Sequence, residues 1–373
     1  MVKPRAHFTI LALAACALAA SGCAVRGPFV KVTTESLVVS RGPAAPFLSL
    51  ARSPGALYAV FADRSTTTLD LLELPEGPHL PSSSPAPQVI DKVDIAPPLS
   101  SAFGEHLLSI ASGSAAVLYL DRATDVKSVL KLATRKLGEA QWNLDVLEPS
   151  GDPLLLDSDE AGRFGAAWSS SMLLYRPAGA HVPASVPPLA FKLEGRPCPD
   201  GTGGSTAFDS LTSQLFALRW TGSGFSTRVV PGAGPVQASL RSAAGLLRVV
   251  SWDAKARRLV LHQEKAPGGS FSSETVTVCD GTEEVALLAG PTDATFLVLF
   301  DQVVSLGAGR TSSQVSLIAP GSILGARGTR YRKAVLCSGD SNIDGFAAVR
   351  TTDALYVLVS QGDLKLIRIA LAP

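Results

Sequence analysis

The segment Asp340-Ser341-Asn342-Ile343-Asp344-Gly345 is the part of the chain whose residue types and spacing point most clearly to chemistry. Asp340, Asn342 and Asp344 place side-chain oxygens at alternate positions, and Gly345 permits a sharp turn behind them. Oxygens arranged in this way suit Ca²⁺, a hard cation with oxygen ligands. The segment is therefore a candidate for a weak calcium site. The interpretation that we favour is an Asx-rich turn whose side chains bind their own backbone.

Two calcium-binding families can be compared with this motif. The twelfth position of an EF-hand loop would be Thr351 in place of the bidentate Glu, so the segment is not an EF-hand. It resembles the shorter calcium loops of integrin-like propeller repeats, in which Asp-x-Asn-x-Asp-Gly leads directly into a strand. That family closes the site with an acid three residues after the Gly, where this chain has Ala348. Calcium is the one cofactor that the resemblance implies.

No other constellation predicts a reaction. The histidines at 79, 106, 181 and 262 are scattered, and no nucleophile elbow or phosphate-binding loop is present. The acidic stretch 157–162 resembles the turns of sialidase-type repeats only faintly, because it lacks their spacing. We therefore assign no catalytic residue.

The cysteines divide into two groups. Cys16 lies in the N-terminal apolar run and Cys23 directly after it, which leaves Cys198, Cys279 and Cys337 in the body of the chain. Three thiols allow at most one internal disulfide, and their pairing stays open. The alternative is that they are small buried apolar side chains.

The N-terminus has the features of a targeting signal. Lys3 and Arg5 precede an uncharged apolar run over residues 8–20, which is too short to span a bilayer. The run ends at Ala20-Ser21-Gly22-Cys23, which resembles the lipobox of bacterial lipoproteins. The resemblance implies a signal peptide over residues 1–22, lipidation of Cys23 and a short tether over residues 23–28. Because Ala24 follows the cysteine, it also implies a cell-envelope protein anchored in the outer membrane, with the periplasmic or surface face left open.

Composition limits the partners. Without residues 1–22 the chain has 31 basic and 32 acidic residues, so no electrostatic footprint for nucleic acid is visible. Hydrophobic residues make up 46% of the chain and charged residues only 17%, which predicts a large core.

One unit recurs along the chain: an apolar strand, a short turn and a stronger apolar strand that often ends at Asp or Trp. Its second strand is apolar on both faces, so the sheets must be covered on both sides. After most copies of this hairpin come two further β-rich runs, and four-strand units at intervals near 40 to 50 residues are typical of β-propeller blades. The seven copies cover residues 47–63, 107–121, 153–168, 208–220, 236–253, 285–301 and 346–360.

These repeats predict an all-β fold with a single seven-bladed β-propeller over residues 29–373. The last repeat lacks an outer strand, and Phe29–Val39 is long enough to supply it and close the ring. The fourth and fifth copies start only 28 residues apart, so six or eight blades stay open. Pro-rich stretches near 75–87 and 177–199 are expected to be loop insertions on one rim.

The sequence therefore favours a membrane-tethered, non-catalytic binding or scaffold propeller for a protein or glycan partner. The alternative is an extracytoplasmic carbohydrate-active hydrolase or lyase of the same fold. The first strands of the repeats begin mostly with apolar residues, which disfavours the enzyme. A trio of tryptophans, Trp168, Trp220 and Trp252, ends three second strands and is expected to pack between blades.

Overall fold

The computed structural model describes residues 30–371 except 43, 64, 94–105, 112, 125–126, 150–152, 159–163, 169–171, 177–183, 186–192, 200–203, 221–224, 233, 308–309 and 326–330. All helices and strands assigned in this part of the chain are β-strands. The described residues include the predicted calcium turn and the side chains of two of the three cysteines in the body of the chain. The predicted signal peptide, Cys23 and the tether lie outside the described residues.

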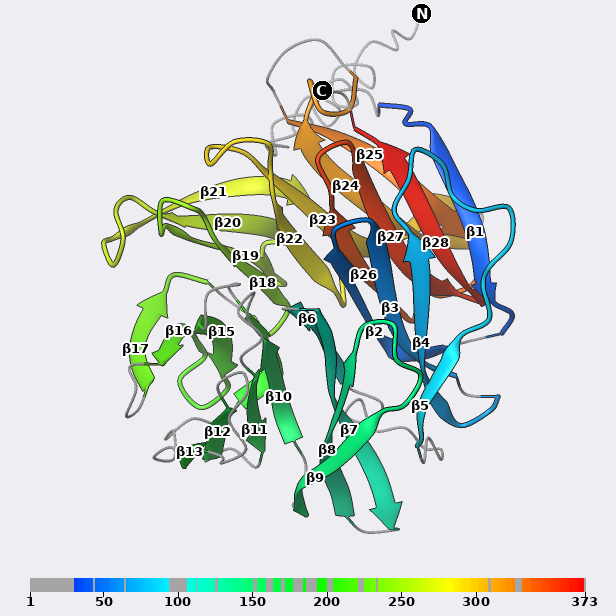
Figure 1. The fold of residues 1–373 in the computed structure, drawn as a ribbon. Coiled ribbons are helices and arrows are strands. Elements are labelled where there is room, and N and C mark those ends of the chain that lie inside the picture. Colours follow the sequence, from blue (N-terminus) through cyan, green and yellow to red (C-terminus); the bar gives the residue numbers. More distant parts are fainter. Residues whose placement is uncertain are drawn as a thin grey trace, which may run out of the picture.

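The described strands form seven antiparallel sheets of four strands each, arranged around an axis (Figure 1). Six sheets consist of four consecutive strands, which we number blades 1 to 6, and the seventh combines the last three strands with the first. The prediction of a seven-bladed all-β propeller is confirmed.

The strand bounds follow the chain. Blades 1 to 3 comprise β2 (Ala44–Ser53), β3 (Ala56–Asp63), β4 (Thr68–Pro75), β5 (Gln88–Lys92), β6 (His106–Ala111), β7 (Ser114–Thr124), β8 (Lys127–Lys136), β9 (Asn143–Pro149), β10 (Pro153–Ser158), β11 (Phe164–Trp168), β12 (Met172–Arg176) and β13 (Ala184–Ser185). Blades 4 and 5 comprise β14 (Leu193–Pro199), β15 (Gly204–Asp209), β16 (Gln214–Trp220), β17 (Phe225–Val230), β18 (Gln237–Arg241), β19 (Leu247–Asp253), β20 (Arg258–Glu264) and β21 (Phe271–Val278). Blades 6 and 7 comprise β22 (Val285–Ala289), β23 (Phe296–Gly307), β24 (Arg310–Pro320), β25 (Tyr331–Gly339), β26 (Gly345–Arg350), β27 (Ala354–Gln361), β28 (Asp363–Ala370) and β1 (Thr34–Ser40).

The ring is closed by β1, which pairs antiparallel with β28 as the outer strand of blade 7. Closure by an N-terminal strand is confirmed, but the strand begins at Thr34 and not at Phe29. The backbone N–H of Val30 donates to the carbonyl of Lys333 in β25 at 3.0 Å. This bond draws residues 30–33 across to blade 6 before the chain enters blade 7.

The blades share one orientation, which defines two rims. At the start of β26 the N–H of Phe346 donates to Glu284 of blade 6, and at its end Arg350 contacts the carbonyl of Ala289, also of blade 6. Neighbouring first strands therefore run in the same direction. We call rim A the rim where first strands end and turn into second strands, and rim B the opposite one. Since Thr34 pairs with Ile369 near the end of β28, the chain enters the propeller at rim A.

The fourth repeat corrects one prediction. Residues 208–220 fall in the second and third strands of blade 4, whose first strand is β14. This strand lies inside the range 177–199 that was predicted to be a Pro-rich loop, and β13 lies there too. Pairing of β14 with β15 is interrupted between Glu194 and Cys198, and such a bulge accommodates proline in a strand. The short interval before the fifth repeat is explained by the same shift.

The core lies between the blades, as the two-sided apolar strands predicted. In β3, Leu57, Ala59 and Phe61 pack against blade 7, whereas Tyr58 and Val60 pack against blade 2. Each blade therefore buries both faces, which is why its central strands lack polar alternation.

Three blades end their second strand with the same turn. Asp63 accepts hydrogen bonds from the N–H of Ser65 and from its hydroxyl, at 2.7 and 2.6 Å. Four residues after each such Asp, a residue other than glycine adopts the left-handed conformation. These residues are Thr67, Ser213 and Arg257, with φ of 53°, 54° and 51°, which follow Asp63, Asp209 and Asp253. The Asp that often ends a second strand thus organises a turn on rim B.

We expect Thr67→Gly to raise the free energy of unfolding by about 0.5–1 kcal/mol. A β-branched residue in the left-handed region is strained, and glycine removes that strain at some cost in chain entropy. Denaturant unfolding of the variant measures the change. Thr66→Gly, next to it but without positive φ, should lower the stability; equal effects of the two variants would contradict the explanation.

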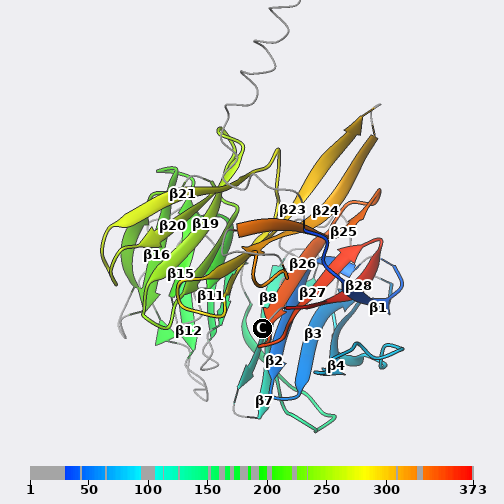
Figure 2. The same cartoon turned by 90° about the horizontal axis from the view of Figure 1, so that it is seen from above.

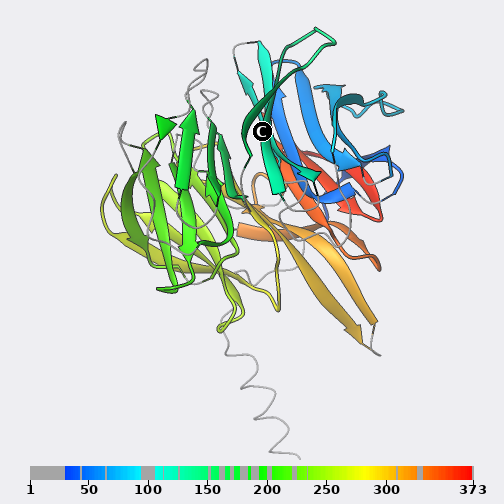
Figure 3. The same ribbon diagram turned by 90° about the horizontal axis from the view of Figure 1, so that it is seen from below.

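One hairpin is longer than the others. Strands β23 and β24 of blade 6 extend past the neighbouring sheets as a two-stranded arm (Figures 2 and 3). Val303 and Leu306 on this arm are exposed.

Candidate functional site: a cleft on rim A

The segment between β4 and β5, residues 76–87, is a Pro-rich loop that crosses from blade 1 to blade 7. We call it the strap. The N–H of Leu80 donates to one carboxylate oxygen of Glu35 at 2.8 Å, and His79 Nδ1 lies 2.9 Å from the other. These contacts, first the one with Leu80, lower the pKa of Glu35. The carbonyl of Gly77 accepts hydrogen bonds from Tyr356 and Arg368 of blade 7. The strap therefore reinforces the closure made by β1.

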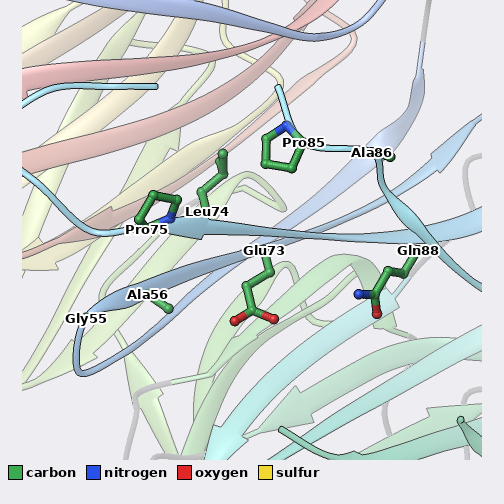
Figure 4. Close-up of a pocket in the computed structure, with 8 residues that line it drawn as sticks. All are labelled: Gly55, Ala56, Glu73, Leu74, Pro75, Pro85, Ala86 and Gln88. Carbon is green, nitrogen blue, oxygen red and sulfur yellow. The ribbon is translucent and has the colours of Figure 1, made fainter. Parts of the chain in front are cut away.

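An open cleft of about 470 Å³ lies where the strap leaves and re-enters blade 1. In Figure 4 the side chains of Glu73 and Gln88 point to the same side, whereas Leu74 points to the other side. The cleft thus combines apolar walls with one carboxylate and one amide. It is lined by Gly55, Ala56, Glu73, Leu74, Pro75, Pro85, Ala86 and Gln88.

Tyr58 and Glu73 form the acidic side of this region. The Tyr58 hydroxyl donates to Glu73 Oε1 at 3.4 Å. Burial, and then the charge of Glu73, raise the pKa of Tyr58, while the charge of Arg135 opposes them. The tyrosine therefore stays a neutral donor at physiological pH, and Glu73 remains an exposed acceptor.

Behind Gln88 lies a buried cation, Arg135 of β8 in blade 2, which is only 3% exposed. Its guanidinium donates to Gln88 Oε1 and stacks over Trp142 with 4.7 Å to the ring centroid. Within the described residues, the Nε of Arg135 has no hydrogen-bond partner and its guanidinium forms no ion pair. Because Gln88 uses its Oε1 to accept from Arg135, its amide N–H groups are free to donate to another molecule.

The junction of blades 4 and 5 provides a comparison, because there a buried charged group is paired with an opposite charge. Arg228 of β17 forms an ion pair with the buried carboxylate of Glu264 at the end of β20. At the junction of blades 1 and 2 the neutral Gln88 faces the buried cation instead. Burying a charge without an opposite charge is costly, which sets this junction apart.

The predicted calcium residues lie in the turn between β25 and β26. Asp340 and Asn342 are exposed, and Asp344 is half-buried. The N–H of Asp344 donates to the carbonyl of Ser360, and the Ser360 hydroxyl approaches its carboxylate at 3.4 Å. Both contacts join Asp344 to β27 and not to the backbone of its own turn, so the favoured interpretation, an Asx-rich turn, also stays a prediction. In the described residues no group of three or more His, Cys, Asp or Glu side chains could hold a metal ion. Calcium binding here stays a prediction.

The described cysteines are free thiols. Cys279 is buried in the core between blades 5 and 6, and Cys337 is half-buried between blades 6 and 7. Burial raises the pKa of Cys279 to about 11 and raises that of Cys337. The side chain of Cys198 lies outside the described residues, as do those of Trp168, Trp220 and His106.

Sequence reasoning singled out none of the cleft residues. Glu73, Gln88 and Arg135 carry no motif, and they meet only because β5 and β8 belong to adjacent blades. The Pro-rich stretch at 75–87 was the one available signal, since loops of that length are often functional. Trp252 packs into the core between blades 5 and 6, as expected.

No protein-family model and no curated protein sequence match this chain. Solved structures do match its fold. A catalytically inactive virginiamycin B lyase from Staphylococcus aureus with quinupristin is 9% identical (TM-score 0.55; 90% of this chain and 99% of the lyase covered). YCF48 bound to D1 peptide is 12% identical (TM-score 0.53; 90% and 95% covered). The WD40 domain of Toxoplasma gondii coronin is 10% identical (TM-score 0.51; 94% and 90% covered).

At these identities the likeness defines the fold alone: the chain is a β-propeller. The neighbours include a lyase and a peptide-bound protein, so the fold is compatible with both of the function classes considered above. No helix in the described residues is long and apolar enough to cross a membrane.

Proposed function

We propose that this protein is a membrane-tethered, non-catalytic binding propeller that holds a segment of a protein partner in the rim A cleft. The observation that carries the proposal is the pairing of an exposed carboxylate, Glu73, with an amide, Gln88, in an open cleft. One group accepts and the other donates, which suits the N–H and C=O groups of an extended peptide. Pro75, Pro85 and Ala86 supply apolar walls for its side chains.

A protein partner is favoured over a glycan because the described tryptophans are engaged elsewhere. Trp142 stacks on Arg135, and Trp252 packs in the core between two blades. Sugar sites commonly offer an open aromatic face, and neither ring is available as one.

The tether supports a partner in or near the membrane. The chain enters at rim A, the rim that carries the cleft. Six residues lie between Cys23 and Val30, which makes seven Cα-to-Cα steps. An extended chain spans at most about 3.4 Å per step, so lipidation would hold rim A within about 24 Å of the bilayer. The protein would be lipid-anchored in the bacterial cell envelope.

Site-specific photo-crosslinking tests the proposal. A photoreactive phenylalanine at Ala86, in the cleft, should yield a discrete crosslinked protein in envelopes of the cells that make this protein. The matched control position is Leu211, which is 70% exposed on a rim B turn and should yield none. Identical products at both positions, or none at Ala86, would refute cleft binding. In parallel, Cys23→Ser should move the folded protein from the membrane fraction to the soluble fraction.

A further inference from the structure

Three first strands carry an arginine as their last or next-to-last residue at rim A: Arg52 in blade 1, Arg241 in blade 5 and Arg350 in blade 7. Each arginine pairs with a leucine near the start of the second strand of its blade, so the three occupy equivalent positions; these leucines are Leu57, Leu247 and Leu355. The Nη1 of Arg350 reaches the carbonyl of Ala289 in blade 6. Because an arginine occupies the same position in three blades, its neighbouring groups can be compared between these blades.

In two of these blades an acid at the end of the third strand neutralises the arginine. Glu76, directly after β4, lies 3.5 Å from Arg52 Nε. Glu264, the last residue of β20, lies 3.8 Å from Arg241 Nη1, which also donates to the carbonyl of Gly245 at 2.9 Å. The fold therefore provides a place for a carboxylate next to this arginine.

Blade 7 lacks the acid. The N–H of Glu76 donates to the carbonyl of Gly55, and the N–H of Leu371 donates in the same way to Asp353, so Leu371 occupies the position of Glu76. The third strand of blade 7 ends with Ile369 and Ala370 and is followed by Leu371, and none of these three residues has an ionisable side chain. Asp353, the acid in the adjoining turn, accepts from the Thr351 hydroxyl at 3.0 Å and makes no ion pair with Arg350.

Arg350 is correspondingly short of partners. Its contact with Ala289 is long, at 3.5 Å, and its buried Nε has no hydrogen-bond partner among the residues that the structure describes. Burial, and then the positive charge of Arg52 on the neighbouring first strand, lower its pKa. Of these two arginines, Arg52 has Glu76 as its ion-pair partner.

We propose that Arg350 is a binding site for a carboxylate of the partner, an acidic side chain or a chain terminus, which fills the place that Glu76 and Glu264 fill in blades 1 and 5. The ligand class follows from these two internal examples, in which the group beside the arginine is a carboxylate. Arginine also binds carboxylates in a two-point geometry. The inference rests on the proposed function, since it names the chemistry that the partner brings to rim A.

Acetate is the probe for a direct test on the full chain. In ¹⁵N-labelled protein the Arg350 Nε–H signal, assigned by its loss in Arg350→Lys, should shift saturably, with half-saturation on the order of 10 mM for so small a ligand. Acetamide and chloride at the same ionic strength should leave it in place. The Nε–H signal of Arg241, whose acid is present, is the internal control and should move little.

Two results would overturn the site: no acetate-dependent shift at Arg350, or equal shifts at Arg350 and Arg241. A shift with phosphate but not with acetate would refute the carboxylate. These outcomes are separate from the crosslinking at Ala86, which tests partner binding without reference to Arg350. If Arg350→Lys fails to fold, Arg350→Gln provides the assignment, and circular dichroism verifies the fold.

Discussion

Replacing Lys131 with methionine is expected to lower the free energy of unfolding by about 3–5 kcal/mol, the largest loss that we expect from a single substitution away from the apolar core. Lys131 of β8 donates to Asp91 Oδ2 at 2.8 Å and to Asp121 Oδ2 at 2.6 Å. Asp91 lies on β5 and the other two on blade 2, so this charge network joins two blades. The Tyr119 hydroxyl donates to the same oxygen of Asp91 at 2.6 Å.

The size of the effect follows from burial. The side chains of Lys131, Asp91 and Asp121 are 18%, 16% and 8% exposed. Removing the one cation leaves two carboxylates of like charge close together in a poorly solvated place, which is the costly way to break a buried ion pair. Burial by itself lowers the pKa of Lys131, but its hydrogen bonds to Asp121 and Asp91 outweigh burial and raise the pKa overall. The contribution is therefore complete below the usual lysine pKa and is lost at higher pH.

Denaturant unfolding at neutral pH measures the loss. Lys92→Met is the matched control, because Lys92 is exposed on β5 beside Asp91 and should change stability by less than about 0.5 kcal/mol. Adding Asp121→Asn to Lys131→Met should restore part of the stability, since it removes one of the two neighbouring negative charges. A loss under about 1 kcal/mol for Lys131→Met would show that water reaches the carboxylates and that the network does not fasten the two blades.

The fold could be predicted because its signals are local and repeated. Strands such as β3 and β23 are apolar on both faces, and only a sheet covered on both sides accommodates them. The spare N-terminal strand and the incomplete last repeat together predicted the closure. The first strand of blade 4 was missed because Pro197 and Pro199 indicated a loop, whereas Pro197 lies in a bulge of β14 and Pro199 ends the strand.

The cleft could not be predicted in the same way. Gln88 and Arg135 are 47 residues apart, and their contact depends on how two blades dock side by side. The meaning of Arg350 likewise emerges only after Leu371 has been aligned with Glu76 through their backbone hydrogen bonds. Repeats this divergent align by structure, because turn lengths differ from blade to blade.

Asp70→Asn is expected to raise the free energy of unfolding by up to about 3 kcal/mol at pH 8 and by almost nothing at pH 4. Asp70 lies in β4 and is 4% exposed. Its Oδ2 accepts a hydrogen bond from the Thr68 hydroxyl at 3.1 Å, and its Oδ1 has no hydrogen-bond partner in the described part of the chain. Burial, opposed by the bond from Thr68 and assisted by the charge of Asp63, raises its pKa to about 6.

The direction of the pH effect follows from this shift. Since the folded-state pKa lies above the usual value of 3.8, the stability associated with a protonated Asp70 is complete below pH 3.8 and is lost as the pH rises through about 6. Asparagine resembles the protonated acid in shape and has no charge to bury. Asp145→Asn, an exposed site on β9, is the control and should leave stability nearly unchanged at both pH values.

A second buried group makes the test sharper, because it titrates over the same range in the opposite direction. Burial lowers the pKa of His262 to about 4, and its ring lies between the hydroxyls of Ser251 and Ser273. Its contribution is complete above pH 6.5 and is lost as the pH falls through about 4. Between pH 4 and 6 the two groups therefore change the free energy of unfolding in opposite directions in the wild-type protein.

In Asp70→Asn the pH dependence caused by His262 should no longer be cancelled, so this variant should lose about 3 kcal/mol of stability between pH 6.5 and pH 4. Adding His262→Gln should flatten that slope. Parallel stability curves for the wild-type protein and Asp70→Asn would mean that the carboxyl group of Asp70 is solvated, in contradiction to its burial.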